Sequence, residues 1–305
     1  MIDIILLQTL WGASIPIAKK LVSFTSPILL TGIRTTAAGC LLLAINYLWG
    51  RTKKNGSTGF DTNYWLIYLQ IIFFGVYLKY IARYWAIQYI PAIKMSLLAN
   101  SAPFISALFG FVFLSEKITI TKWLGLIIGA VGYSIILVTT SKAEFSIGEM
   151  LFISWSELIT LLMVFIDCYC LILYKKLVRD HAHTSFLING IQTIGGGLLA
   201  LCTAFLFEPI TITHPVNFVG WLSASITISN VACHSYSMYL LNYYSVTFVS
   251  FSSFLNTIFT GLYSAYFLQE KITFHYIIGG LTVIIGLYTF YKDELYIYRA
   301  KGANC

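Results

Sequence analysis

Charged residues are scarce in this sequence. Asp, Glu, Lys and Arg make up 10% of its 305 residues, whereas hydrophobic residues make up 58%, and the mean hydropathy is +0.80. A soluble globular domain needs far more charge than this to cover its own surface. The composition therefore excludes an ordinary soluble protein and predicts a chain whose solvent is lipid.

The motifs of several enzyme classes are also missing. The sequence contains no H-E-x-x-H, no nucleophile elbow, no cluster of histidines and no phosphate-binding P-loop. These absences argue against a membrane-embedded enzyme and against ATP-driven transport, and we expect no cofactor and no metal. The net charge of +7 has no basic stripe to carry it, so we expect no nucleic-acid partner. Six cysteines lack the paired C-x-x-C spacing of a metal site and are interpreted as packing residues: Cys40, Cys168, Cys170, Cys202, Cys233 and Cys305.

Long apolar runs separated by short polar breaks are what the sequence has in abundance. Backbone groups cannot stay unpaired in hydrocarbon, so runs of about twenty apolar residues must be helices. Asp3 and Trp11-Gly12 do not fit a cleavable signal peptide, so we expect the first run to be retained as a span. The ten predicted spans are 2–22, 28–49, 64–89, 92–114, 122–140, 149–174, 184–207, 216–240, 246–268 and 274–291.

The basic residues of the loops predict the orientation. Loops on one side of this ten-span scheme hold eleven of them, and loops on the other side hold only Lys19, Lys20, Lys142 and Lys271. By the positive-inside rule the richer side is cytoplasmic. We therefore expect both termini in the cytoplasm of a multi-pass protein of the cell (inner) membrane. The eleven are Arg51, Lys53, Lys54, Lys117, Lys122, Lys175, Lys176, Arg179, Lys292, Arg299 and Lys301.

Two segments of the first half recur in the second half. Residues 114–119 (Leu-Ser-Glu-Lys-Ile-Thr) return at 268–273 as Leu-Gln-Glu-Lys-Ile-Thr, and Gly-Ile-Arg-Thr at 32–35 returns at 190–193 as Gly-Ile-Gln-Thr. Each half then holds about five spans, and an odd number makes the second half enter the membrane upside down. The predicted fold class is an all-α integral membrane protein with ten transmembrane helices as two inverted five-helix repeats, 1–140 and 149–291, followed by a cytoplasmic tail at 292–305.

Several segments of the chain, some of them repeated, resemble a known family. Residues 11–16 (Trp-Gly-Ala-Ser-Ile-Pro), Arg34, residues 86–92 (Ala-Ile-Gln-Tyr-Ile-Pro-Ala), Pro103 and residues 116–119 (Glu-Lys-Ile-Thr) are similar to the EamA-type repeat of the drug/metabolite transporter superfamily. The resemblance implies ten helices, cytoplasmic termini, a central cavity, and relatives that move amino acids, nucleotide sugars, sugar phosphates, drugs or nucleoside-type metabolites. It does not name a substrate. In the second half Thr257 occupies the position of Pro103, which departs from the family pattern.

Basic residues inside the predicted spans are the first candidates for a binding site, because a charge in hydrocarbon is expensive. Lys79 and Arg83 are four residues apart and share one helix face, about 15 Å and about 9 Å from the outer end of the third span. With Arg34 and Lys94 they define a possible ladder of cations suited to a carboxylate or phosphate. The alternative interpretations are pairing of the third-span cations with Glu157, a helix-end or lipid contact for Arg34, and snorkelling of Lys94 to the membrane surface.

Two carboxylates lie in the predicted sixth span. Glu157 and Asp167 are ten residues apart and nearly on one helix face. Either is a candidate for proton coupling, since burial raises the pKa of a carboxyl group. The alternative is charge pairing for Glu157 and a position near the membrane surface for Asp167.

Polar and aromatic residues complete the predicted site. Asn100 and Asn256 occupy nearly matching positions in the two halves, and His234 lies in the eighth span. Each lines a cavity or forms a hydrogen bond between helices. Tyr80 and Trp11 are candidates for stacking on a planar substrate, as are Tyr84 and Tyr236.

Together these features predict a secondary active transporter or exchanger, working by alternating access, for a small polar metabolite. We expect the substrate to be anionic or zwitterionic, of amino-acid, nucleotide or sugar-phosphate type, with Lys79 binding its negative charge beside Arg83. The alternatives are an exporter of broad specificity, a structural or receptor-like membrane protein, and an enzyme. The predicted partners are the substrate, the lipid bilayer and a coupling proton or counter-substrate, and the chain is a monomer or a homodimer.

Overall fold

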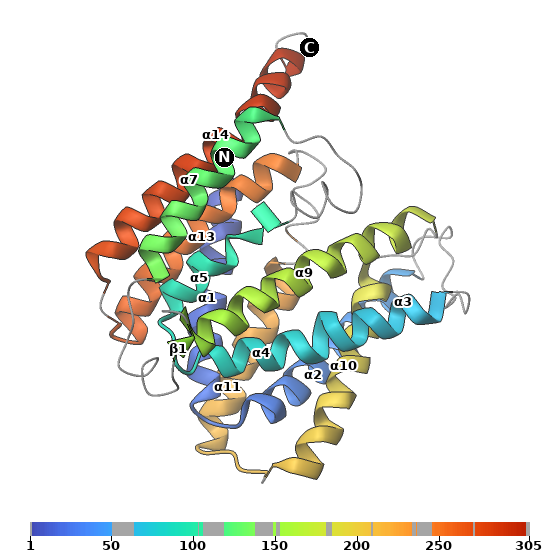
Figure 1. Ribbon diagram of the computed structural model, residues 1–305. Helices are drawn as coiled ribbons and strands as arrows, with labels where there is room; N and C mark the ends of the chain where they lie inside the picture. Colours follow the sequence, from blue (N-terminus) through green and yellow to red (C-terminus); the bar gives the residue numbers. More distant parts are fainter. Residues whose placement is uncertain are drawn as a thin grey trace. The chain divides into compact units, whose positions relative to one another are not determined.

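The computed structural model describes residues 2–50, 64–102, 104–105, 119–137, 149–150, 153–180, 185–208, 210–233, 236, 246–270 and 272–302. These residues are helical apart from turns and one short antiparallel β pair, β1 (Glu149–Met150) with β2 (Ile153–Ser154). The contacts divide the chain into two compact units, which are described separately (Figure 1). Unit 1 comprises residues 1–17, 89–161 and 232–305, and unit 2 comprises residues 18–88 and 162–231.

Unit 1 is built from helices of both sequence halves. Its apolar core contains Phe104 and side chains from α5, α7 and α14, among them Ile93, Ile136 and Val283. Most of α1 (Ile2–Val22) and the first turns of α9 (Trp155–Asp180) also belong to it. The other helices of the unit are α5 (Ala92–Ala99), α7 (Ile120–Leu137), α13 (Val246–Phe267) and α14 (Phe274–Gly302).

Unit 2 also combines both halves. Tyr68, Ile71 and Ile188 form a small buried cluster there, between the third span and α10. The third span is one continuous helical segment of three parts, and the eighth span has two parts. The elements are α2 (Pro27–Gly50), α3 (Trp65–Gln70), η2 (Ile71–Leu78), α4 (Lys79–Ala86), α10 (Ser185–Phe207), α11 (Pro215–Ser225) and η3 (Ile226–Cys233).

In unit 1 the helices α7 and α14 pack backbone to backbone through glycine (Figure 1). A Cβ atom at Gly125 would lie 2.7 Å from the Phe290 nitrogen, and a Cβ atom at Gly279 would lie 2.6 Å from Ile136 Cγ1. Gly125 occupies in the first half the place of Gly279 in the second, and Ile136 the place of Phe290. The two contacts are therefore images of each other, as in the self-complementary interface of a twofold dimer.

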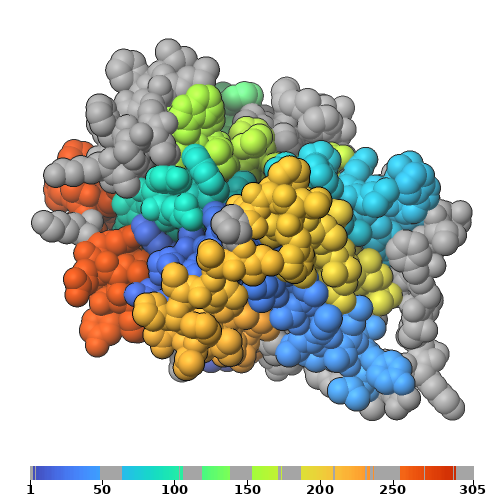
Figure 2. Space-filling view, turned by 90° about the horizontal axis from the view of Figure 1, so that it is seen from below, coloured from blue at the N-terminus to red at the C-terminus, as the bar shows by residue number. Residues whose placement is uncertain are grey.

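In unit 2 the helices α2 and α10 show the same arrangement, and their surfaces adjoin in Figure 2. A Cβ atom at Gly32 would lie 2.7 Å from Leu201 Cδ2, and a Cβ atom at Gly190 would meet Leu43 Cδ2. Gly32 is equivalent to Gly190 and Leu43 to Leu201, so these contacts are again images of each other. In both helix pairs the residue numbers of successive contacts increase along one helix and decrease along its partner. The paired helices therefore run antiparallel.

Two π-helical segments lie at equivalent places in the two halves. Each is eight residues long and lies in the third span of its half: η2 runs from Ile71 to Leu78 and η3 from Ile226 to Cys233. π-Helices are rare, and they occur frequently at functional sites because they widen the helix and turn the side chains that follow. Here η2 leads directly into Lys79 and the rest of α4.

The structure corrects part of the predicted span boundaries. Each of the ten predicted ranges contains helix, but the sixth helix begins at Trp155 and not at residue 149, because Glu149–Met150 and Ile153–Ser154 form the β pair. The predicted tail continues α14 as far as Gly302. Within the described residues, four helices are long and apolar enough to cross a membrane: Pro27–Leu48, Trp65–Ala86, Ile120–Leu137 and Leu187–Phe207.

The glycine contacts of α14 predict that replacing glycine by alanine has opposite effects on stability at two positions. Gly286→Ala places a Cβ atom 2.6 Å from the Gly129 backbone nitrogen, whereas Gly280→Ala places one at an ordinary 3.5 Å from Leu97. We expect Gly286→Ala to destabilise the protein by about 1–3 kcal/mol through overpacking, and Gly280→Ala to be neutral or stabilising because alanine favours helix. Thermal unfolding in detergent measures both, and equal melting temperatures would contradict the packing described.

Candidate functional site

Arg34 is a buried cation without a carboxylate partner among the described residues. Its side chain extends from α2 and is 6% exposed. Nη1 donates to the Tyr84 hydroxyl at 2.6 Å, and Nη2 donates to Asn230 Oδ1 at 3.2 Å. Nε has no hydrogen-bond partner within the described part of the chain. The guanidinium is thus held by neutral groups, with donor capacity to spare for an anion.

Lys79 forms an ion pair with Asp167. Lys79 Nζ lies 2.8 Å from Asp167 Oδ1, and the side chains are 20% and 45% exposed. Lys79 Nζ also lies 5.0 Å from the centre of the Tyr80 ring, and the Arg34 guanidinium lies 5.4 Å from the same ring. Tyr80 therefore contacts both cations through its π face.

Arg83 is a further cation of α4, one helical turn beyond Lys79. It is half-buried, and it forms no ion pair or hydrogen bond with any residue that the structure describes. Among Arg34, Lys79 and Arg83, only Lys79 has an ion-paired carboxylate, Asp167, within the described residues. The cluster has more positive than negative charge, which suits a ligand that brings a carboxylate.

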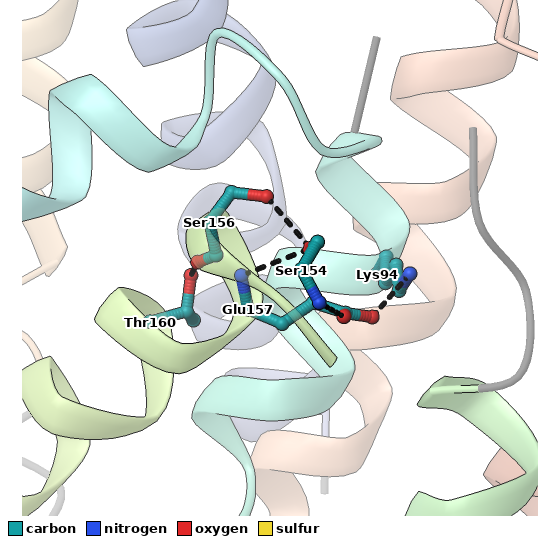
Figure 3. A network of polar contacts seen from close by, with 5 residues as sticks. All are labelled: Lys94, Ser154, Ser156, Glu157 and Thr160. Atoms are coloured by element: carbon teal, nitrogen blue, oxygen red, sulfur yellow. Dashed lines mark hydrogen bonds and ion pairs between the residues drawn. The ribbon is translucent and has the colours of Figure 1, made fainter. Parts of the chain in front are cut away.

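Glu157 has a different partner from the one that its sequence position suggested. In unit 1 its Oε1 lies 2.5 Å from Lys94 Nζ, and the two side chains are 1% and 0% exposed (Figure 3). Lys94 was considered as part of a ladder of cations, with snorkelling to the membrane surface as the alternative, and its complete burial contradicts the snorkelling. A buried, fully paired ion pair of this kind is a fixed contact within its unit.

The same carboxylate also fixes the beginning of α9. Glu157 Oε2 accepts the backbone N–H of Ser154 at 2.6 Å, and Ser154 Oγ accepts the backbone N–H of Glu157 at 3.3 Å (Figure 3). This reciprocal pair is a capping box, with Ser154 as N-cap. The sequence Ser154-Trp-Ser-Glu157 carries its signature, and this signal would have predicted the helix start that the hydropathy pattern missed.

The repeated Glu-Lys-Ile-Thr segment has a structural role in unit 1. Glu270 Oε2 accepts the backbone N–H of Ala92, the first residue of α5, at 2.8 Å. A carboxylate at this helix end satisfies an unpaired amide and complements the helix dipole. The second copy of the segment thus caps a helix, and the first copy, apart from Thr119, lies outside the described residues.

The asparagines predicted for the site lie in unit 1. Asn100 is 8% exposed, and its Nδ2 lies 2.5 Å from Thr257 Oγ1. The Thr260 hydroxyl lies 3.1 Å from Asn256 Oδ1 and 3.1 Å from the Gly12 carbonyl oxygen, and these two acceptors share its single hydrogen. The Asn100 bond joins α5 to α13, which is the interhelical alternative considered for that residue, whereas the Asn256 bond lies within α13.

The predicted residues are distributed between the two units. Arg34, Lys79, Tyr80, Arg83 and Asp167 come together in unit 2, and Trp11 and the asparagines belong to unit 1. Trp11 is half-buried on α1. His234 lies outside the described residues, and the role of each residue in binding stays a prediction.

Asn230 is the residue that the sequence did not single out. It lies in η3, far from Arg34 in the chain, and its amide oxygen accepts from the guanidinium. The sequence around an asparagine in an apolar span does not predict which helix the side chain faces. The pairing of Asn230 with Arg34 is therefore seen only in the folded structure. The Tyr84 hydroxyl, considered only for stacking, proved to be the nearer partner.

Comparison with known proteins identifies the kind of chain to which this site belongs. The model of the EamA-like transporter family matches twice, at residues 1–138 and at residues 154–292. An S-adenosylmethionine/S-adenosylhomocysteine transporter of Chlamydia muridarum is 24% identical over 93% of this chain and 89% of its own. A protein of the same description from Chlamydia trachomatis is 23% identical over 93% and 86%. An uncharacterized transporter of Archaeoglobus fulgidus is 25% identical over 93% and 94%.

The fold also matches solved structures. One crystal structure superposes with a TM-score of 0.64 over 94% of both chains, at 16% sequence identity. This likeness concerns the fold alone. It places the helical arrangement described above among known architectures.

The two ion pairs predict different effects on stability when their lysine is replaced by methionine. Lys94→Met leaves Glu157 charged, buried and unpaired, so we expect it to destabilise the protein by about 3–5 kcal/mol. Lys79→Met leaves Asp167 unpaired but 45% exposed, so we expect nearly normal folded yield. Monodispersity and melting temperature in detergent test both variants, and Lys94→Met with Glu157→Gln is expected to recover part of the loss. A stable Lys94→Met protein would contradict this account of Glu157.

Proposed function

This chain belongs to the EamA-like transporter family, and we propose on that premise that it is a secondary transporter or exchanger for a zwitterionic metabolite. Arg34, Lys79 and Asp167 are proposed to bind the charged groups of the substrate. The chain acts as a carrier and not as an enzyme, in line with its family and with the relatives named as transporters.

The proposed architecture is ten transmembrane helices as two inverted repeats, 1–140 and 149–291, in the cell membrane. Three observations support it: the family model matches each half once, the two π segments lie at equivalent places, and equivalent helices pack antiparallel with exchanged contacts. A twofold operation that maps α2 onto an antiparallel α10 must reverse the helix direction. A parallel repeat would instead keep the direction.

The turns at the ends of α2 and α10 give this proposal a testable form. Within unit 2, Thr213 N–H donates to the Phe24 carbonyl and Thr25 Oγ1 donates to the Thr211 carbonyl, so the turn after α10 lies beside the turn before α2. In the repeat, however, the turn after α10 is equivalent to the loop after α2. The turn after α10 and its equivalent, the loop after α2, therefore lie at opposite ends of α2.

We expect reporters in these two connections to lie on opposite sides of the membrane. Green fluorescent protein fused after residue 55 should fluoresce in the cytoplasm, and alkaline phosphatase fused after residue 212 should be active outside it, because inversion exchanges the two faces. A fusion after residue 302 is the control for a cytoplasmic terminus. Both connections on one side would exclude the inverted arrangement.

The observation that carries the proposed substrate class is the buried Arg34 guanidinium. Keeping a charge in an apolar environment without a counter-charge is costly, and no described carboxylate contacts Arg34. Tyr84 and Asn230 hold the guanidinium in place, which is how a preorganised anion site is built. A carboxylate on the substrate would supply the missing charge.

The Lys79–Asp167 pair extends this site to a zwitterion. In the absence of substrate the two side chains neutralise each other at 2.8 Å. A substrate that carries both an ammonium and a carboxylate offers a replacement partner to each of them. The exchange keeps both Lys79 and Asp167 paired in the two states, and the substrate carboxylate can be shared between Lys79 and Arg34, whereas a simple anion would leave Asp167 in competition with it. Asp167, half-exposed, is also the better placed of the two proton-coupling candidates, since Glu157 is held by Lys94.

The named relatives narrow the class. S-Adenosylmethionine and S-adenosylhomocysteine both carry an amino-acid zwitterion and a planar base, and these compounds name the chlamydial relatives. Tyr80, with its ring beside both cations, offers a face for the planar group or the sulfonium. We therefore propose a nucleoside-bearing amino acid as the substrate, with exchange of two such compounds as the mode.

Arg34→Gln is expected to lower uptake of labelled S-adenosylhomocysteine into proteoliposomes by about tenfold or more, since a charge-assisted bidentate contact contributes about 1.5–3 kcal/mol. Lys122→Gln, which removes a cation on α7 in unit 1, is the matched control and should transport normally. Inhibition of this uptake by simple amino acids such as glycine, by nucleosides and by apolar cations tests the proposed class of substrate. Uptake that only apolar cations inhibit would overturn the proposal in favour of an exporter of broad specificity.

A further inference from the structure

We propose that an apolar groove in unit 1, between α13 and α14, binds one acyl chain of a membrane phospholipid. The floor of the groove is formed by side chains of α5, and all of its lining residues belong to unit 1. Arg34, Lys79 and Asp167, which are proposed to bind the transported substrate, belong to unit 2 and contribute nothing to this groove. The lipid site is therefore an addition to the proposed function.

Two glycines open the groove. Gly261 on α13 and Gly280 on α14 both line the cavity, whose volume is about 320 Å³. The positions of their missing side chains face α5: a Cβ atom at Gly261 would lie 2.9 Å from Ile93 Cδ1, and one at Gly280 would lie 3.5 Å from Leu97 Cδ2. A cavity of about 150 Å³ lined by aliphatic side chains already admits benzene, so this groove has room for a hydrocarbon group.

The rim of the groove is made of exposed apolar side chains. Ile258 and Leu262 on α13 and Ile277 and Leu281 on α14 line it, and each is between 50% and 57% exposed. On the helices of a membrane protein such side chains face lipid, because lipid tails are as apolar as they are. The α5 side chains beneath them are buried. A groove with an exposed apolar rim and a buried floor can be entered from the bilayer without passing through water.

Thr257, the hydroxyl residue of the α13 wall, is already engaged by protein partners. Its Oγ1 lies 2.5 Å from Asn100 Nδ2 and 2.9 Å from Ser96 Oγ. Sites for small polar molecules instead contain a few polar groups placed to fix the orientation of the ligand. The lining therefore favours a hydrocarbon chain over a polar compound.

The length of the groove matches one leaflet of a bilayer. The lining begins at Ile272, in the turn between α13 and α14, and reaches Ile284 on α14. In the proposed architecture this turn lies at a membrane face. From Tyr276 to Ile284 the helix rises about 12 Å, and half of a hydrocarbon core is about 15 Å thick. A phospholipid chain that enters beside Ile272 fits this length, whereas a helix from a second copy of the chain would cross both leaflets.

A bound chain would complete the packing of α13 against α14. Atoms that line an empty groove have no contact partner on one side and lose the dispersion energy of those contacts. Such contacts are the main force that holds helices together in lipid. The acyl chain supplies them in the place that Gly261 and Gly280 leave open.

Photolabelling of wild-type protein locates the chain. The protein is placed in nanodiscs of palmitoyl-oleoyl phosphatidylcholine containing a phosphatidylcholine with a diazirine midway along one acyl chain, and labelled residues are mapped by mass spectrometry. The reference surface is the exposed apolar face of α7, where Leu124, Ile127 and Val131 are 50%, 59% and 53% exposed. We expect the groove residues to be labelled about fivefold more than this face. Equal labelling of the two surfaces would overturn the proposal.

Gly280→Leu fills the groove from α14 and tests the same site by removal. Gly220→Leu on α11 is the matched control, because a Cβ atom there meets nothing within 4 Å and the same side chain is added to an exposed helix. Gly280→Leu should lower the labelling of the groove by about fivefold, and Gly220→Leu should leave it unchanged. Labelling that Gly280→Leu does not reduce would contradict the assignment. If Gly280→Leu folds poorly, the wild-type comparison of the two surfaces decides alone.

Native mass spectrometry of the same three proteins distinguishes a lipid from a second copy of the chain. Monomers that retain a phospholipid in wild type and in Gly220→Leu, and lose it in Gly280→Leu, would support the lipid site. Dimers that Gly280→Leu dissociates would assign the groove to a second copy and overturn the proposal. Wild type that retains no phospholipid would overturn it as well. These measurements do not depend on transport, so a failure of the proposed substrate class leaves them unaffected.

Discussion

The close approach of glycine backbones is the constraint on which the rest of this structure depends. Lipid provides no hydrophobic drive between helices, so packing contacts must hold them together, and small residues bring the backbones near enough. At Gly125 and Gly286 in unit 1, and at Gly32 and Gly39 in unit 2, there is no room for a Cβ atom. Because both helix pairs unite equivalent helices of the two halves, the same contacts that stabilise the units also impose their internal symmetry.

The polar residues of unit 2 take their positions from this scaffold. α2 and α10 present the two versions of the Gly-Ile-x-Thr segment, and the third span packs against both of them. The π segments turn the side chains that follow or lie within them toward that surface, which is how Asn230 comes to face Arg34. The groups proposed to bind the substrate are thereby held by helix and not by loop, an arrangement that favours defined geometry.

Much of the fold could be predicted from the sequence, for identifiable reasons. Periods of hydropathy predicted helix in the right ranges, and the repeated segments predicted two related halves because local sequence similarity survives without any contact information. The partners of the charged residues were not accessible. Lys79 pairs with Asp167 and Lys94 with Glu157, and choosing between such pairings requires the rotation of each helix about its axis. The π segments change that rotation partway along a span, so a count at 3.6 residues per turn places Lys79 correctly on its helix but misjudges what it faces.

The capping box at Ser154 and Glu157 marks a different kind of limit. Its four-residue signature was present in the sequence, yet hydropathy alone extended the span to residue 149. Apolar character reports where a chain tolerates lipid, whereas caps report where a helix begins. The two kinds of signal have to be weighed separately at each boundary.

The exchanged contacts between equivalent helices have an evolutionary consequence. In a dimer of identical subunits, every substitution appears twice, so a charge introduced at one image position is introduced at the other as well. Joining the two copies in one chain removes that coupling. Arg34 and Gln192, the third residues of the two Gly-Ile-x-Thr segments, then become free to diverge while the glycine contacts that hold the copies together stay alike. A duplicated and fused chain can in this way recognise a molecule whose two ends are chemically unlike, which a strictly symmetric dimer cannot do at a site on its own axis.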